Sequence, residues 1–172
     1  FPEITRKLVA EINTVLHGRV PTVADLDKLT YLDWVIKESM RVLPTVVINE
    51  RILAEDTELG GYRIKAGMHI HFSLYHLHKM AELYPEPYEF KPERWQTINP
   101  SPYEYSPFSA GHRMCIGAPF AMLEIKIVLA MLLQRYRLQA IPGTKVDRQG
   151  VITISPKDGL PLPGQRGNVP PC

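Results

Sequence analysis

The chain of 172 residues has a hydrophobic content of 45% and carries 20 basic against 18 acidic residues, for a net charge of +2. This length is sufficient for a domain with a real core, and the nearly balanced charge gives no indication of a nucleic-acid-binding protein. Two cysteines do not make a disulfide framework, and no run of about eighteen apolar residues provides a transmembrane span.

Helical patterns open the chain. Residues 2–16 begin with Pro-Glu, a favourable first helical turn, and carry apolar residues at helical spacing. Thr and Asp at the ends of residues 22–25 have the spacing of a capping box and predict a short helical turn. A second long helix is predicted over residues 30–42, and it ends before Pro44 because proline cannot continue a helix.

Strand and turn signals follow. Residues 46–54 are rich in β-branched side chains and predict a strand. The two glycines inside residues 59–62 predict a hairpin turn, and residues 62–65 and 68–72 predict further strands. This part of the chain is therefore expected to form small β-sheets.

The C-terminal half combines coil, helix and short strands. Residues 85–107 are rich in proline without a clear period and predict a long irregular segment. Residues 118–135 predict a long apolar helix. Two short strands are predicted at 151–154 and 160–162, on either side of a turn at 156–159. The whole pattern predicts a mainly α protein with small β-sheets, of the α+β class.

The most informative stretch is residues 108–117, Phe-Ser-Ala-Gly-His-Arg-Met-Cys-Ile-Gly, which we call the Cys loop. Gly111 and Gly117 permit a sharp turn and a close approach of the backbone to another group. The helix that follows is expected to direct its N–H groups and positive dipole end at Cys115, and Arg113 adds a positive charge. These features favour a thiolate that acts as nucleophile or metal ligand, although a single cysteine in such a loop is more often a half-buried structural residue.

The pattern Phe-x-x-Gly-x-Arg-x-Cys-x-Gly resembles the heme-ligand loop of the cytochrome P450 family. Glu38-x-x-Arg41 and Pro-Glu-Arg-Trp at residues 92–95 resemble the family's second and third motifs, and the proline-rich coil resembles its irregular meander. The resemblance implies the C-terminal portion of the cytochrome P450 fold. Residues 1–163 are then the C-terminal heme-thiolate segment of a larger single catalytic domain, and 164–172 are expected to be a disordered tail.

The resemblance also implies roles for individual residues. Cys115 is the catalytic residue and the axial ligand of iron in heme b. Arg113 and Arg51 are partners of the heme propionates, with a strand-surface charge as the alternative for Arg51. Phe108 lies against the thiolate side of the ring. The cofactor-binding set is therefore Cys115, Arg113, Arg51, Phe108, Gly111 and Gly117.

A structural ionic cluster is implied for Glu38, Arg41 and Arg94. In this reading both guanidiniums present two-pronged hydrogen bonds to the buried carboxylate, and the cluster fixes the coil and the Cys loop. Two apolar stretches resemble pocket-lining segments, with ordinary core positions as the alternative. The substrate-pocket candidates in these stretches are Val46, Val47, Ile48, Ile152 and Thr153.

The function implied is a heme-thiolate monooxygenase that hydroxylates or epoxidises an apolar organic substrate with O2 and NAD(P)H-derived electrons. A redox partner of the ferredoxin or flavoprotein reductase type supplies these electrons. Lys126, Arg135 and Arg137 either help to dock this partner or are ordinary charges near a helix end. The alternatives are a non-monooxygenase heme-thiolate enzyme, such as a peroxygenase, isomerase or dehydratase, and a truncated, non-catalytic fragment.

The upstream part of the fold, with the distal oxygen-activating residues, is expected to be missing. A soluble, cytoplasmic location is favoured, and a membrane-anchored form stays open as the alternative because the N-terminal part is expected to be missing. Among the histidines, His69 and His71 alternate like two ligands on a strand. No cysteine or acid close in the sequence completes a tetrahedral zinc set, so no second metal site is expected, and His76 and His78 are expected to be structural.

Overall fold

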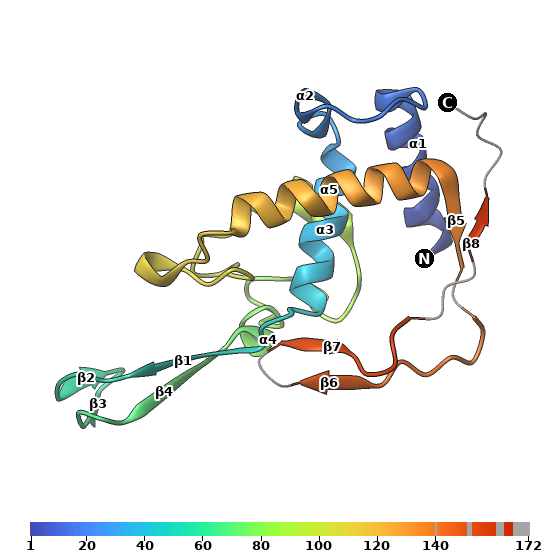
Figure 1. Ribbon diagram of the computed structural model, residues 1–172. Coiled ribbons are helices and arrows are strands. Elements are labelled where there is room, and N and C mark those ends of the chain that lie inside the picture. The colour runs from blue at the N-terminus through green and yellow to red at the C-terminus, as the bar shows by residue number, and fades with distance from the viewer. Residues whose placement is uncertain (140, 151–152, 161–163, 167–172) are drawn as a thin grey trace.

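The computed structural model describes residues 1–139, 141–150, 153–160 and 164–166 (Figure 1). Its long helices cross one another, while an irregular segment and the Cys loop connect the shorter elements. The helices are α1 (Pro2–Leu16), α2 (Val23–Leu26), α3 (Thr30–Val42), α4 (Leu74–Leu77) and α5 (Ala118–Arg135), with 3₁₀ turns η1 (Pro92–Gln96) and η2 (Gly111–Arg113).

The strands of the described residues form two-stranded antiparallel ribbons. In Figure 1 the β1–β4 and β2–β3 ribbons extend away from the helices as one arm. The pairs are β1 (Ile48–Ile52) with β4 (His69–Ser73), β2 (Thr57–Leu59) with β3 (Tyr62–Ile64), β5 (Tyr136–Leu138) with β8 (Gly164–Arg166), and β6 (Arg148–Gly150) with β7 (Ile154–Pro156).

The hydrophobic core lies where α1, α3 and α5 meet. Burial of these apolar side chains at helical spacing is the main stabilising contribution of this region. α5 crosses α3 in this view and packs against α1 (Figure 1). The buried members of the core are Leu8, Ile12, Leu16, Leu26, Leu29, Leu32, Ile36, Ala130 and Leu133.

The N-terminus of α3 is capped by a side chain from α1. Leu29, the residue before α3, has no side chain that could accept a hydrogen bond. The carboxylate of Glu11 instead accepts from the backbone N–H groups of Tyr31 at 2.7 Å and Leu32 at 2.9 Å. These N–H groups have no acceptor within their own helix, so Glu11 joins α1 to α3 while it caps α3.

The predicted helices coincide with α1, α3 and α5, and the predicted hairpin turn joins β2 to β3. The C-terminal prediction was only partly right. A turn follows β7 at residues 157–158, but β7 pairs with β6, which comes before it in the chain, and not with a strand after this turn. Gly164–Arg166, within the expected disordered tail, form β8. Residues 161–162, expected in a strand, and the tail end at 167–172 lie outside the described residues.

Among the helices that the structure describes, none combines the length and the apolar character that a membrane crossing requires.

Candidate functional site

The Cys loop is a closed turn with its sulfur-bearing residue on the surface. The backbone N–H of Cys115 donates to the carbonyl of Phe108 at 2.9 Å, which joins the two ends of the loop. Gly111 has a φ of 68°, a left-handed conformation that favours glycine, and a Cβ there would lie 3.6 Å from the hydroxyl of Tyr103. Residues 111–116 are all exposed, so Cys115 is accessible to a ligand.

The surroundings of the sulfur differ in one respect from the prediction. Within the described part of the chain, no N–H group donates a hydrogen bond to the Sγ of Cys115. The first amide of α5, that of Ala118, donates instead to the carbonyl of Cys115 at 3.2 Å. What remains of the prediction is the position of the sulfur just before the positive end of a long helix. Gly117 lies beside it, and a Cβ at Gly117 would be 3.7 Å from Sγ.

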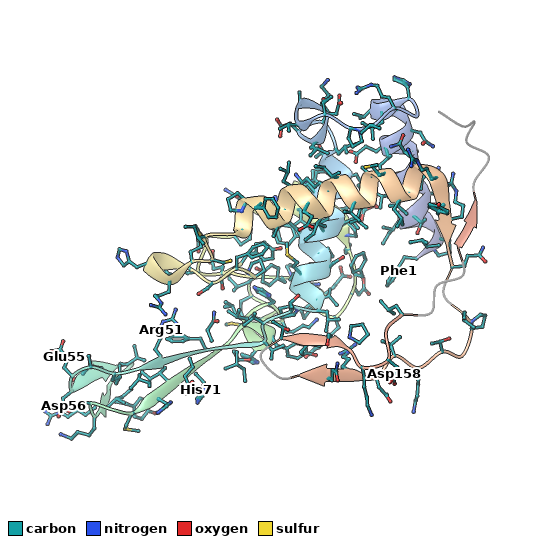
Figure 2. All side chains as sticks on the ribbon, viewed as in Figure 1. Phe1, Arg51, Glu55, Asp56, His71 and Asp158 are labelled. Carbon is teal, nitrogen blue, oxygen red and sulfur yellow. The ribbon has the colours of Figure 1, made fainter. Side chains whose placement is uncertain are left out.

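The two arginines expected at the propionates are on different elements. Arg113 ends η2 with an exposed side chain, and no hydrogen bond or ion pair joins its guanidinium to any other described residue. Arg51 is on β1, on the side of the ribbon toward the Cys loop in Figure 2, and its Nη1 donates to the carbonyl of Glu50 at 2.7 Å. Both remain charged and can meet an anionic ligand group. Phe108 is half-buried at the start of the loop.

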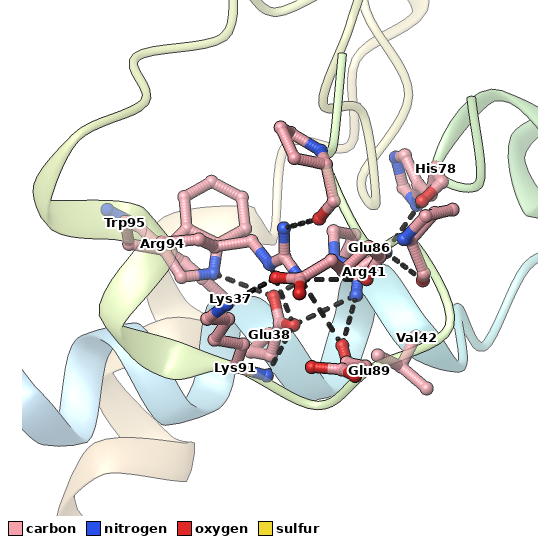
Figure 3. A network of polar contacts seen from close by, with 12 residues as sticks. Lys37, Glu38, Arg41, Val42, His78, Glu86, Glu89, Lys91, Arg94 and Trp95 are labelled. Carbon is pink, nitrogen blue, oxygen red and sulfur yellow. Dashed lines mark hydrogen bonds and ion pairs between the residues drawn. The ribbon is translucent and has the colours of Figure 1, made fainter. Parts of the chain in front are cut away.

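The ionic cluster is present and buried (Figure 3). Glu38 and Arg41 are fully inaccessible, and Arg94 is 6% exposed. Arg41 meets the Glu38 carboxylate with a two-pronged contact, from Nε to Oε2 and from Nη2 to Oε1, both at 2.9 Å. Arg94 reaches Oε1 through Nε alone, at 3.0 Å. The expectation of two such forks was therefore wrong for Arg94.

The remaining nitrogens of the two guanidiniums bind backbone carbonyls of the proline-rich coil and of His78, which follows α4. Arg41 Nη1 donates to the carbonyls of His78 at 2.8 Å and Pro87 at 2.7 Å. Arg94 Nη1 donates to the carbonyl of Pro85 at 2.5 Å. Carbonyl groups in a coil lack the backbone hydrogen bonds of a helix or sheet. The bonds from the two guanidiniums therefore fix the path of this irregular segment.

The Glu38 carboxylate stays ionised in this cluster. Burial alone would raise the pKa of Glu38, but hydrogen bonds from Arg41 and the Lys91 amide, with the charges of both arginines, hold the pKa below its ordinary value. The amide of Lys91 donates to Oε1 at 2.9 Å and the indole of Trp95 to Oε2 at 3.1 Å. The contact of Trp95 with Glu38 was not predicted, although its position next to Arg94 in the motif was an available signal.

His78 is a second residue whose contacts the sequence did not predict. Its ring is completely buried, and its Nε2 accepts a hydrogen bond from the backbone N–H of Ser106 at 3.2 Å. Ser106 comes two positions before Phe108, the first residue of the Cys loop. His78 was expected to be structural, but no local pattern in the sequence indicates the partner of its ring.

The two stretches expected to line a pocket meet in the structure. The N–H of Ile154 donates to the carbonyl of Thr45 at 2.7 Å, which places Thr153 next to the segment that begins β1. Val46 and Val47 are half-buried, whereas Ile48 and Thr153 are exposed. Ile152 lies outside the described residues.

The described residues contain no group of three or more histidine, cysteine or acidic side chains suited to a metal ion. Glu50, across the ribbon, nevertheless contacts His69 Nδ1 and lies 3.7 Å from His71 Nε2.

Lys126 was a candidate for docking a partner, but its Nζ forms an ion pair with Asp33 at 2.7 Å, between α5 and α3. Its charge is thus used inside the fold.

Comparisons with known proteins agree on one family. Residues 1–159 match the family described as Cytochrome P450. The chain is 45% identical over 145 residues to Cytochrome P450 4c21 of Blattella germanica, covering 81% of the chain and 29% of that protein. It is 43% identical over 165 residues to Cytochrome P450 4V2 of Mus musculus, covering 92% and 31%.

A bacterial protein is also similar. The chain is 40% identical over 146 residues to the cyclooctat-9-en-7-ol 5-monooxygenase of Streptomyces melanosporofaciens, covering 83% of the chain and 32% of that protein. The chain therefore spans about a third of the length of these curated relatives.

Proposed function

The chain belongs to the cytochrome P450 family, and from that membership we propose that it provides the heme-binding part of a heme-thiolate monooxygenase. The observation that carries the proposal is the exposed Cys115 on a closed loop, next to a coil held by the buried cluster of Glu38, Arg41 and Arg94. A rigid support of this kind keeps a single ligand atom in place.

The donor set fits heme. One accessible thiol is available as an axial ligand, and Arg113 and Arg51 can pair with the two carboxylates of heme b. No competing group of three metal ligands is present among the residues with described positions. When bound, heme would supply the activation of O2 from which one oxygen atom enters a C–H or C=C bond of the substrate.

The residues of this chain would then have distinct tasks. Cys115 would donate electron density to the iron as its thiolate ligand. The two arginines would orient the macrocycle. The apolar stretch from Val46 to Ile48, which carries no charged side chain, would contact the substrate and favour an apolar one, because a charge there would lack a partner. NAD(P)H-derived electrons would arrive through a redox partner of the ferredoxin or flavoprotein reductase type.

The ligand assignment is tested in the whole protein by the absorption spectrum of the reduced CO complex. We expect the wild type to give the thiolate-type spectrum and Cys115→Ser to lose it. Cys172→Ser, which removes the other cysteine of the chain, is the matched control and should keep the spectrum. A thiolate-type spectrum that survives Cys115→Ser contradicts the proposal.

The reaction class is tested by turnover. Consumption of O2 and NAD(P)H with oxygen incorporation into an apolar substrate supports the monooxygenase. Turnover with peroxide alone, or rearrangement without any electron donor, identifies the peroxygenase, isomerase or dehydratase alternative. Val47→Phe should change the position of oxidation more than the heme content, and lost heme with unchanged products would assign Val47 to the core.

A further inference from the structure

His78 links three elements that are distant in sequence. It directly follows α4, its carbonyl accepts from Arg41 of α3, and its ring accepts from the amide of Ser106 near the Cys loop. One residue thus connects the ionic cluster to the segment that leads into the loop with the sulfur. The ring is enclosed by Tyr105, with ring centroids 5.3 Å apart, and by Tyr84 at 6.3 Å.

The two ring nitrogens of His78 are in different situations. Nε2 accepts the Ser106 hydrogen bond, so the proton of the neutral ring is on Nδ1. Nδ1 is fully buried and has no hydrogen-bond partner among the described residues. A buried N–H without a partner destabilises a fold, and a purely apolar ring of similar size would avoid that cost. The specific contribution of a histidine at this position is therefore the acceptor Nε2.

The backbone N–H of Ser106 has few other hydrogen-bond acceptors available. Ser106 is 5% exposed, so water does not readily replace the acceptor. Pro107 follows it and has no N–H of its own. The carbonyl of Ser106 accepts from the amide of Ser109, which has a φ of 66°, at the entrance to the Cys loop. The residue whose N–H is held by His78 thus also provides the carbonyl that closes the turn at the entrance to the loop.

We propose that His78 is a positioning residue for Cys115: Nε2 holds the N–H of Ser106, and through Ser106 the orientation of the Cys loop is set relative to the Glu38–Arg41–Arg94 cluster. The significance for catalysis rests on the proposed heme-thiolate function. The hydrogen bond itself does not, and it can be tested without heme.

Two amide substitutions separate the two ring nitrogens. His78→Gln places an amide oxygen close to the position of Nε2 and can still accept from Ser106. His78→Asn is one methylene shorter, reaches only the position of Nδ1, and leaves the Ser106 N–H without an acceptor. Both variants lose the aromatic ring, so the difference between them reports the hydrogen bond. His76→Gln, at an exposed histidine two positions earlier, is the control for the substitution itself.

The first measurement is hydrogen exchange of the Ser106 amide in the whole protein, with and without heme. We expect wild type, His76→Gln and His78→Gln to exchange slowly and His78→Asn to exchange about tenfold faster, as loss of one native hydrogen bond implies. Equal rates in His78→Asn and wild type overturn the proposal. Equally fast exchange in His78→Gln and His78→Asn also overturns it, because ring packing and not the acceptor would then be decisive.

The second measurement is the spectrum of the reduced CO complex after mild heating. His78→Asn should convert to the non-thiolate form at a lower temperature than His78→Gln at equal heme content. Equal conversion in the two variants overturns the link to Cys115. If the wild type shows no thiolate-type spectrum, the proposed function fails, and the exchange rates still decide whether His78 positions the loop.

Discussion

The Glu38 carboxylate accepts hydrogen bonds from Arg41 in its own helix and from Lys91, Arg94 and Trp95 in and before η1. It is fully buried and is matched by donors on both oxygens. A buried ion pair of this kind contributes little net stability compared with an apolar core, but removal of one partner leaves the others uncompensated. The cluster is therefore sensitive to a change in any of its members.

Glu38→Gln is expected to destabilise the protein by about 3–5 kcal/mol, because it leaves two buried guanidiniums without their counter-charge. Urea unfolding and heme content of the purified whole protein measure the effect. Glu82→Gln, at an exposed position, is the control and should behave as the wild type. A soluble, heme-replete Glu38→Gln protein with only slower turnover contradicts the structural role.

His78 predicts a pH dependence of stability. Burial, and then the positive charges of Arg41 and Lys79, lower the pKa of His78 from 6.5 to about 4. The unfolded chain therefore binds a proton below pH 6.5 that the folded protein does not bind until about pH 4. The stability that His78 contributes is complete above pH 6.5 and falls as the pH falls toward 4, by at most about 1.4 kcal/mol per pH unit.

Urea unfolding at several pH values between 4.5 and 6.5 tests this dependence, since the Glu38 carboxylate, with a pKa below its ordinary 4.5, stays ionised there. Arg41 and Lys79 are the charged groups that act on His78. His78→Gln should show a shallower loss of stability on acidification than the wild type. Parallel curves for the two proteins contradict the assigned pKa shift.

At the scale of elements, α3 depends on α1 for its first turn. Glu11→Ala removes the acceptor for the amides of Tyr31 and Leu32 and should cost about 0.5–2 kcal/mol, the range for loss of a helix cap. Thermal unfolding measures the change, with Glu58→Ala on β2 as an exposed control. A control-like midpoint for Glu11→Ala would show that water caps α3 equally well.

The helix bounds were predictable because local chemistry sets them. Proline in the first turns of α1 and α5 and Pro44 after α3 act within a few residues of their own position. The ionic cluster was predictable only through its motif, since charges at i and i+3 on a helix are usually solvated. The two-pronged contact of Arg41 and the single contact of Arg94 depend on how η1 approaches α3, which local pattern does not encode.

The features that the sequence did not predict have a common origin. The pairing of β7 with β6, the cap that Glu11 provides and the ion pair of Lys126 with Asp33 all join residues across the fold. The turn signals predicted the positions of turns correctly, but the sequence of a turn does not determine which strands pair on either side of it. The contact of His78 with Ser106 is likewise a tertiary feature without a local signature.

At the scale of the whole molecule, large apolar side chains are exposed on several elements. Ile116 of the Cys loop is 99% exposed, Phe120 of α5 is 69% exposed and Ile52 of β1 is 63% exposed. Exposed apolar side chains of this size on several elements favour association with other protein surfaces.

Residues 1–172 expressed alone are therefore expected to aggregate and to bind little heme. Light scattering and size-exclusion chromatography measure the aggregation, and Ile52→Gln combined with Phe120→Gln should reduce it. Recovery of the unaltered segment as a monodisperse, heme-replete monomer would contradict this expectation.

The position of the Glu38 partners along the chain has a consequence for the order of folding. Glu11 and Tyr31 are separated by 20 positions, whereas Glu38 and Lys91 are separated by 53. Closing the longer loop costs more chain entropy. The hydrogen bonds to Glu38 that offset this cost form only when η1 packs against α3. The α1–α3 pair should thus assemble early and the cluster late. Incorporation of heme needs the Cys loop in place and should therefore follow formation of the cluster. Conditions that slow formation of the cluster should lengthen the time during which the newly made protein lacks heme.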